Sequence, residues 1–106
     1  MEVDCVAVKA RMDAGDEFLF LDCREQREFD HVRIEGTVLV PMNELPQRAA
    51  ELGAWKDKDI IVHCHHGMRS LRVAEWLRNN GFPAAFSMAG GIDEWALTID
   101  PSLRRY

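Results

Sequence analysis

The sequence predicts an α/β fold with a mainly parallel central sheet and helices on both faces. Two patterns lead to this prediction. Short runs that are apolar at almost every position recur along the chain, and such runs are typical of strands buried on both faces of a sheet. Segments with helical periodicity alternate with these runs, which is the order expected of a parallel sheet covered by helices.

The first half of the chain is predicted to form a helix at residues 5–14, a strand at 18–21, a helical turn within 25–31, a strand at 37–40 and a helix at 44–52. Asp4 is the expected N-cap of the first helix, and Gly15 is its expected end because glycine adopts the left-handed conformation at low cost. Both strands are short apolar runs, and Pro41 stops the second. The last helix is expected to be capped by Asn43 and closed by Gly53.

The second half continues the alternation, with a strand at residues 60–63, a helix at 69–80, a strand at 84–87 and a helix at 92–97. Leu71, Ala74 and Leu77 recur with helical spacing, and Gly81 is expected to end that helix. The tail after the last helix has no periodicity, although Tyr106 is expected to help tie it to the body of the domain.

Length and composition limit the class of protein. The chain has 106 residues, of which 47% are apolar, so it is expected to be one globular domain rather than a disordered segment. With 13 basic against 18 acidic residues its net charge is -5, which argues against nucleic-acid binding. No apolar run approaches the roughly 18 residues of a membrane span, so no membrane partner is expected.

The cysteines and the N-terminus indicate the compartment. Three cysteines are too few and too scattered for a disulfide framework. Residues 1–4 are acidic and lack the basic start of a signal peptide. The sequence therefore predicts a reduced, soluble, cytoplasmic domain.

The most informative segment surrounds Cys64, which follows a predicted buried strand and comes just before a predicted helix. Open α/β sheets bind ligands at the carboxyl ends of their strands. Backbone N–H groups of the loop and of the first helical turn would point inward and form a cradle for an anion. Such a field stabilises a thiolate, so a lowered pKa is predicted for Cys64.

The charge around this cysteine supports an anionic ligand. Residues 60–74 contain Arg69 and Arg72 and no acidic residue, which gives a local charge of +2 in an acidic chain. Arg69 is expected to serve the site, whereas a site role and a solvent-facing position are equally open for Arg72.

Three segments carry short signatures in order along the chain. They are residues 21–25 (Leu-Asp-Cys-Arg-Glu) with Glu28 and Phe29, residues 64–70 (Cys-His-His-Gly-Met-Arg-Ser), and residues 90–95 (Gly-Gly-Ile-Asp-Glu-Trp). Together they resemble the single-domain rhodanese-like sulfurtransferases, and the second segment resembles that family's active-site loop. The resemblance implies a single rhodanese-like domain over residues 1–106.

The resemblance implies a thiosulfate:cyanide sulfurtransferase-like activity. The Cys64 thiolate would take the outer sulfur of thiosulfate or a similar small anionic donor and become a persulfide. The persulfide would then pass its sulfur to cyanide, a thiol or an acceptor protein. No cofactor and no metal are implied, because the sulfur travels on the cysteine itself.

The resemblance also assigns the other site residues. Beside the catalytic Cys64, the substrate-binding loop comprises His65, His66, Gly67, Met68, Arg69 and Ser70. Arg69 and Ser70 are expected to hold the oxyanion end of the donor, Met68 to line an apolar wall, and the histidines to flank the entrance. Asp22 and Arg24 are expected to support the site by anchoring neighbouring loops through hydrogen bonds and ion pairs.

The chain departs from the family pattern in two places. Residues 32–37 lack the His and Pro that many members have before the second strand, which affects the local conformation and the partner surface. Cys23 stands where Val is commoner. Packing in the core is the favoured interpretation of Cys23, and a resolving cysteine that forms a disulfide with Cys64 is the alternative.

Three other functions compete with sulfur transfer. A cysteine phosphatase also holds a thiolate and an arginine in one loop, but the tyrosine-directed kinds place one more residue between them than the four between Cys64 and Arg69. A metal site at residues 63–66 is disfavoured because adjacent residues seldom converge on one ion, and His63 is expected simply to pack on the sheet. A docking module without activity is disfavoured because the nucleophile is present.

Overall fold

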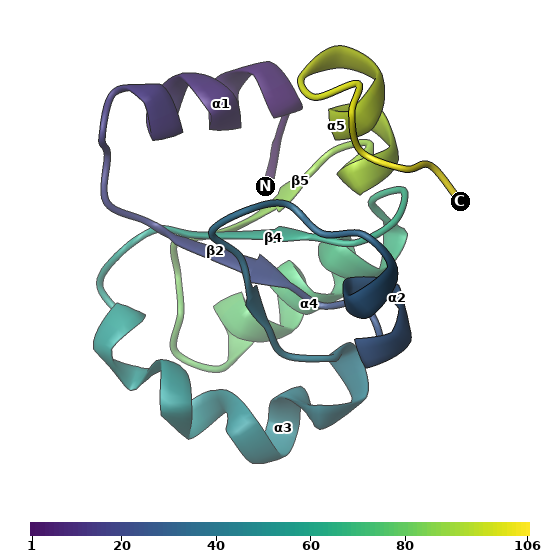
Figure 1. The fold of residues 1–106 in the computed structure, drawn as a ribbon. Helices are drawn as coiled ribbons and strands as arrows, with labels where there is room; N and C mark the ends of the chain where they lie inside the picture. The colour runs from purple at the N-terminus through teal and green to yellow at the C-terminus, as the bar shows by residue number, and fades with distance from the viewer.

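The computed structural model describes all 106 residues and contains a five-stranded parallel sheet (Figure 1). The strands are β1 (Glu2–Val3), β2 (Leu19–Asp22), β3 (Val38–Leu39), β4 (Ile60–His63) and β5 (Ala85–Met88), in the spatial order β1-β5-β4-β2-β3. β2 and β4 are buried at every position and lie beside each other at the centre of the molecule. The predicted α/β fold with its parallel sheet is confirmed.

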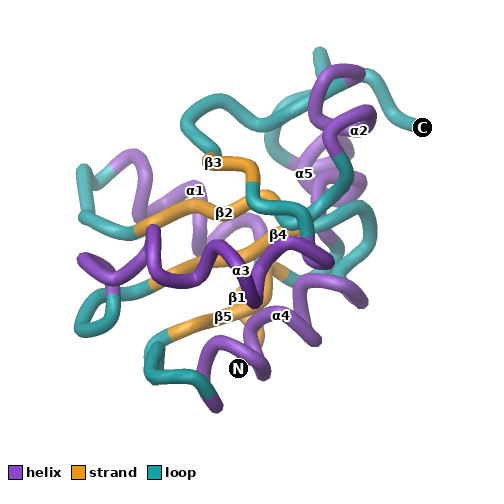
Figure 2. Tube along the Cα trace, turned by 90° about the horizontal axis from the view of Figure 1, so that it is seen from below, coloured by secondary structure: helices purple, strands orange, loops and turns teal.

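Helices cover both faces of the sheet, as the sequence predicts (Figures 1 and 2). They are α1 (Cys5–Asp13), α2 (Gln26–His31), α3 (Leu45–Arg48), α4 (Met68–Asn79) and α5 (Gly91–Thr98). α1 and α5 pack on one face, and α3 and α4 pack on the other. α2 lies beyond the carboxyl end of β2. No helix is long and apolar enough to cross a membrane.

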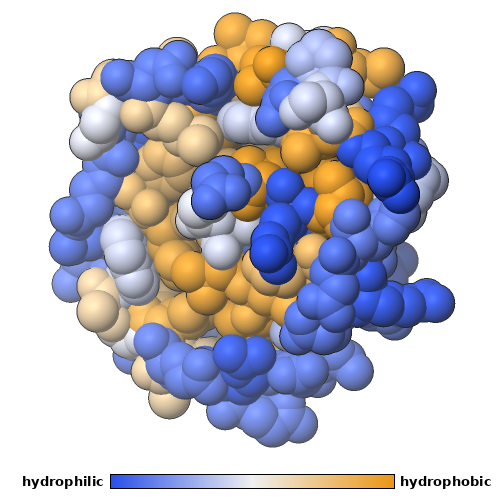
Figure 3. Space-filling model, viewed as in Figure 1, coloured by the Kyte–Doolittle hydropathy of each residue, from blue (hydrophilic) through white to orange (hydrophobic).

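The two faces have separate hydrophobic cores because successive strand side chains point to opposite sides. In β4, Ile60 and Val62 join the core beneath α3 and α4, whereas Ile61 joins the core beneath α1 and α5. Cys64 continues this alternation, so its side chain lies on the α4 side of the sheet. Outside the cores, hydrophilic residues form much of the rim of the face drawn in Figure 3.

Several predicted boundaries are confirmed by their local chemistry. The Asp4 carboxylate accepts a hydrogen bond from the Ala7 N–H at 2.7 Å and caps α1. Gly15 and Gly81 follow α1 and α4 with φ of +74° and +96°, the left-handed conformation that favours glycine.

The predicted helix at 44–52 is wrong in its ends and in its type. A 3₁₀ turn at Met42–Glu44 precedes α3, and a 3₁₀ segment at Ala49–Trp55 follows it. Asn43 therefore lies inside a 3₁₀ turn and caps nothing, and Gly53 does not end the helix because it lies inside the 3₁₀ segment that follows α3. β1 was not predicted, since a two-residue edge strand is too short for a periodic pattern.

Candidate active site

Cys64 lies at the carboxyl end of β4, in a loop that turns directly into α4. Gly67 makes this turn possible: it is the N-cap of α4 with φ of +109°, a conformation that a side chain would strain. A Cβ at Gly67 would also crowd the Gly90 nitrogen at 3.2 Å. The loop therefore wraps closely around the Cys64 sulfur, and the residue is only 1% exposed.

Hydrogen-bond donors converge on this sulfur. The backbone N–H groups of Gly67 and Ser70 donate to Cys64 Sγ at 3.1 and 3.4 Å. Ser70 Oγ lies 3.5 Å from the same sulfur and 2.7 Å from Ser87 Oγ on β5. Both serines are fully buried, so Ser87 can donate to Ser70 while Ser70 donates to a thiolate. The predicted cradle of backbone N–H groups is present.

The neighbouring Cys23 completes the set of donors. A hydrogen bond from the Cys23 thiol is the largest cause that lowers the pKa of Cys64, to about 4. Burial opposes this shift, and the hydrogen bonds from Ser70 and Gly67 reinforce it. The same contact and burial raise the pKa of Cys23. Cys64 is therefore a thiolate at neutral pH, as predicted, and Cys23 keeps its proton.

The start of α5 holds the loop from the other side. The N–H groups of Ile92 and Asp93 donate to the carbonyl oxygens of Cys64 and His65 at 2.9 and 3.1 Å. Gly91, with φ of +60°, lets the two backbones approach, because a Cβ there would collide with both carbonyls. This glycine of the Gly-Gly-Ile-Asp-Glu-Trp segment thus positions the cysteine loop.

The positive charge of Arg69 is paired with a carboxylate. Its guanidinium donates two hydrogen bonds to the Glu28 carboxylate, at 2.7 and 3.0 Å. The Tyr106 hydroxyl donates to the same carboxylate at 2.6 Å. Although burial opposes the shift, these hydrogen bonds lower the pKa of Glu28 to about 2. The +2 charge of residues 60–74 is therefore partly compensated in the folded domain, because α2 brings an acidic partner to Arg69.

Asp22 and Arg24 act as anchors, which agrees with their predicted structural role. Both side chains are fully buried, and Arg24 donates to both Asp22 oxygens at 2.7 to 3.1 Å. Arg24 also donates to the Val32 carbonyl at 2.7 Å and so holds the chain after α2. His63 packs beside Asp22, and burial lowers its pKa, so it is a neutral strand residue as expected.

The remaining loop residues lie at the rim. The His65 ring stacks between His66 and Tyr106, with ring centroids 3.9 and 3.8 Å away. Met68 is 73% exposed, so it lies on the outside of the loop and forms no inner apolar wall. Tyr106 ties the tail to the domain as expected, but its contact with the active-site loop was not predicted.

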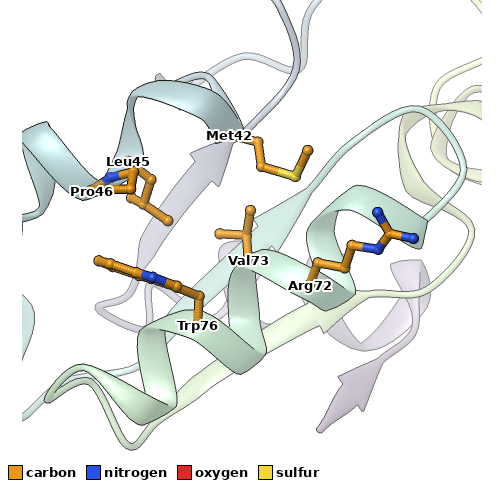
Figure 4. Close-up of a pocket in the computed structure, with 6 residues that line it drawn as sticks. All are labelled: Met42, Leu45, Pro46, Arg72, Val73 and Trp76. Atoms are coloured by element: carbon orange, nitrogen blue, oxygen red, sulfur yellow. The ribbon is translucent and has the colours of Figure 1, made fainter.

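Arg72 lines a pocket that is separate from the Cys64 loop. Together with residues of α3 and α4 it lines a pocket of about 180 Å³ (Figure 4). The lining residues are Met42, Leu45, Pro46, Arg72, Val73 and Trp76. None of them belongs to the loop at residues 64–70, so the structure places Arg72 outside the cysteine cradle.

The sequence did not predict Glu28, Ser87 and Tyr106 as neighbours of the site. Glu28 stood in one of the family signatures, but nothing in the sequence indicated that it would pair with Arg69. Ser87 lies in the strand predicted at residues 84–87, and its link to Ser70 depends on the pairing of β5 with β4.

This geometry can be compared with known proteins. A model of the rhodanese-like domain family matches residues 5–98 of the chain. The chain belongs to the rhodanese-like domain family. It is 28% identical over 95 residues to a sulfurtransferase of Allochromatium vinosum, covering 90% of this chain and 87% of that one. It is 31% identical over 94 residues to the putative sulfur carrier protein YrkF of Bacillus subtilis, covering 89% of this chain and 50% of that one.

A solved structure supports the same assignment. The crystal structure of a rhodanese-like domain protein from Staphylococcus aureus superimposes with a TM-score of 0.81 at 25% identity, covering 100% of this chain and 99% of that one. The rhodanese-like chain spans half or less of the length of several relatives that it matches. The fold and the family are therefore shown, together with similarity to proteins named for sulfur transfer.

Proposed function

We propose that this rhodanese-like domain is a sulfurtransferase that carries a sulfane sulfur as a persulfide on Cys64. The observation that supports the proposal best is the Cys64 thiolate, held by two backbone N–H groups and two side-chain donors at the end of β4. A thiolate with a lowered pKa is a nucleophile that exists at neutral pH. The same donors can hold the negative outer sulfur of a persulfide.

The first step uses thiosulfate or a similar small anionic donor. The Cys64 thiolate attacks the outer sulfur of thiosulfate, the sulfur–sulfur bond of the donor breaks, and sulfite leaves with the electron pair. In the second step a thiophilic acceptor attacks the outer sulfur and restores the thiolate. The acceptor is cyanide in the laboratory and a thiol or a partner protein in the cell. The reaction needs no cofactor, because the sulfur travels on the cysteine itself, and we place it in a reducing compartment such as the cytoplasm, where thiols stay reduced.

The burial of Cys64 favours sulfur transfer over phosphate-ester hydrolysis. With 1% of the residue exposed, a donor reaches it best through a single terminal sulfur atom.

Sulfite release tests the proposal. The native protein mixed with excess thiosulfate, without an acceptor, should release about one equivalent of sulfite per chain, and added cyanide should then give continuous thiocyanate formation. Cys64→Ser should release none, and Cys5→Ser should behave as the native protein. Hydrolysis of an aryl phosphate by the native protein, without sulfite release, would overturn the proposal.

A further inference from the structure

Cys23 and Cys64 are the first residues after two neighbouring strands, β2 and β4. β2 and β4 pair in parallel with Asp22 opposite His63, and the Cys23 N–H donates to the His63 carbonyl at 3.1 Å. The next pair along this register is Cys23 and Cys64. Neighbouring strands lie about 4.8 Å apart, and disulfide-bonded cysteines have Cα atoms roughly 4.4–6.8 Å apart. The backbone therefore places the two cysteines at a separation that a disulfide can span.

The side chains of the two cysteines also meet. Both belong to the core on the α4 side of the sheet, and both are 1% exposed. The two thiols interact, since the contact lowers the pKa of Cys64 and raises that of Cys23. Valine, which is commoner at this position in the family pattern, would fill the same space without this contact. Cys23 therefore places a second thiol beside Cys64 in the same core, where the commoner valine would only pack.

Cys5 provides the contrast within the same chain. It is similarly buried, but its sulfur lies 3.8 Å from the carbonyl oxygens of Ala89 and Gly91 and belongs to the core on the opposite face. No second cysteine shares that core. Cys5 is a packing thiol, and it serves as a matched control for Cys23.

We propose that Cys23 is a resolving thiol that discharges the Cys64 persulfide when no acceptor takes the sulfur. This inference rests on the proposed persulfide chemistry of Cys64. The negatively charged outer sulfur of the persulfide takes the proton of the Cys23 thiol, and the Cys23 thiolate attacks the inner sulfur. A Cys23–Cys64 disulfide forms, the bond between the inner and outer sulfurs breaks, and the outer sulfur leaves with the electron pair as hydrosulfide.

The step balances without an outside oxidant. The two cysteine sulfurs are oxidised to a disulfide, and the sulfane sulfur delivered by the donor is reduced to hydrosulfide. The disulfide ties up the nucleophile until an external dithiol reduces it. The domain thus holds its sulfur for a limited time, and a competing acceptor decides whether the sulfur is transferred or released as hydrosulfide.

The test follows three products after one addition of thiosulfate to the fully reduced native protein without an acceptor. Sulfite reports loading, hydrosulfide reports discharge, and mass analysis of peptides under non-reducing conditions reports the disulfide. The expected result is about one equivalent each of sulfite and hydrosulfide, with Cys23 and Cys64 joined in one linked peptide pair. Cys5→Ser should give the same products, since Cys5 lies on the opposite face of the sheet.

Cys23→Val separates discharge from loading. This variant should still release sulfite and keep the extra sulfur on Cys64. It should form at least about tenfold less hydrosulfide than the native protein. Sulfite release by the native protein with a lasting persulfide and no disulfide would overturn this inference alone. An absence of sulfite would overturn the sulfurtransferase proposal and this inference with it. If Cys23→Val does not fold, the sulfite, hydrosulfide and disulfide formed by the native protein still test the inference.

Discussion

At the scale of single residues, the surroundings of each sulfur distinguish the three cysteines. Two backbone N–H groups donate to the Cys64 sulfur, and together with the neighbouring Cys23 thiol they lower its pKa. Cys5 faces carbonyl oxygens, and burial with the nearby charge of Glu94 raises its pKa to about 11. Three residues of one type therefore have three different reactivities, and only Cys64 is ionised at neutral pH.

Removing the Cys23 donor should weaken this ionisation. We expect Cys23→Val to raise the pKa of the Cys64 thiol above about 4, by roughly one to two pH units, because one hydrogen bond to the thiolate is lost. Titration of thiolate absorbance in the ultraviolet measures this directly, since neither other cysteine ionises below neutral pH. Cys5→Ser should leave the midpoint in place, and an unmoved midpoint in Cys23→Val would contradict the assigned hydrogen bond.

At the scale of elements, the site is the meeting of two helix starts. α4 supplies N–H groups that hold the Cys64 sulfur, and α5 supplies those that hold the carbonyl oxygens of the same loop. Both helices begin after a glycine in the left-handed region, Gly67 and Gly90. The two contacts fix the loop from opposite sides, so the sulfur position depends on both helices.

Gly91→Ala should disrupt this arrangement. The added Cβ would collide with the carbonyls of Cys64 and His65, in a backbone conformation that already disfavours a side chain. We expect a loss of about 2–4 kcal/mol in the free energy of unfolding, measured by urea denaturation, together with a higher pKa for Cys64.

Gly15→Ala is the matched control for this change. Gly15 has a similar φ of +74°, but no atom lies within 4 Å of the position that a Cβ would take there. It should lose only about 1 kcal/mol, from backbone strain alone. Equal losses in the two variants would show that the contact with the loop carbonyls contributes nothing.

At the scale of the whole molecule, one carboxylate joins segments far apart in the sequence. Glu28 on α2 accepts hydrogen bonds from Arg69 on α4 and from Tyr106 in the tail. Arg24 donates to the Tyr106 hydroxyl at 2.9 Å, which connects the group to the end of β2. The tail, the first half of the chain and the active-site loop are thus held by one charged cluster.

Glu28→Gln should weaken the whole domain. The amide cannot accept both hydrogen bonds from Arg69 as a carboxylate does, so we expect the free energy of unfolding to fall by about 1–3 kcal/mol at neutral pH. Glu51→Gln removes an ion pair of Arg48 that is largely exposed, and it should cost less than about 0.5 kcal/mol. Urea denaturation of both variants checks this difference.

The same pair predicts a dependence on pH. The pKa of Glu28 is lowered to about 2, so its contribution to stability is fully present above the ordinary glutamate value of 4.5. That contribution is lost progressively as the pH falls from there toward about 2, because protonation removes the charge that Arg69 binds. The stability difference between the native protein and Glu28→Gln should therefore shrink over this range. A difference that stays constant would contradict the role assigned to this carboxylate.

Most of the order of elements, the parallel sheet and the position of Cys64 at the end of a buried strand could be predicted from the sequence alone. Continuous apolar runs such as residues 60–63 have no polar side, so burial on both faces is their only stable position. Cys64 follows such a run and comes before a helix, which places it at a helix N-terminus in any parallel arrangement. The buried strands and the position of Cys64 depend only on residues close together in the sequence, so local patterns predict them.

The surroundings of Cys64, by contrast, depend on the tertiary structure. Cys23 meets Cys64 because of the register between β2 and β4, and Arg69 meets Glu28 because α2 lies beside the start of α4. Tyr106 reaches His65 only after the tail has folded back. Such contacts join residues tens of positions apart, and no periodicity in the sequence encodes them. The register of the sheet, rather than any segment of the chain, brings the second thiol to the first.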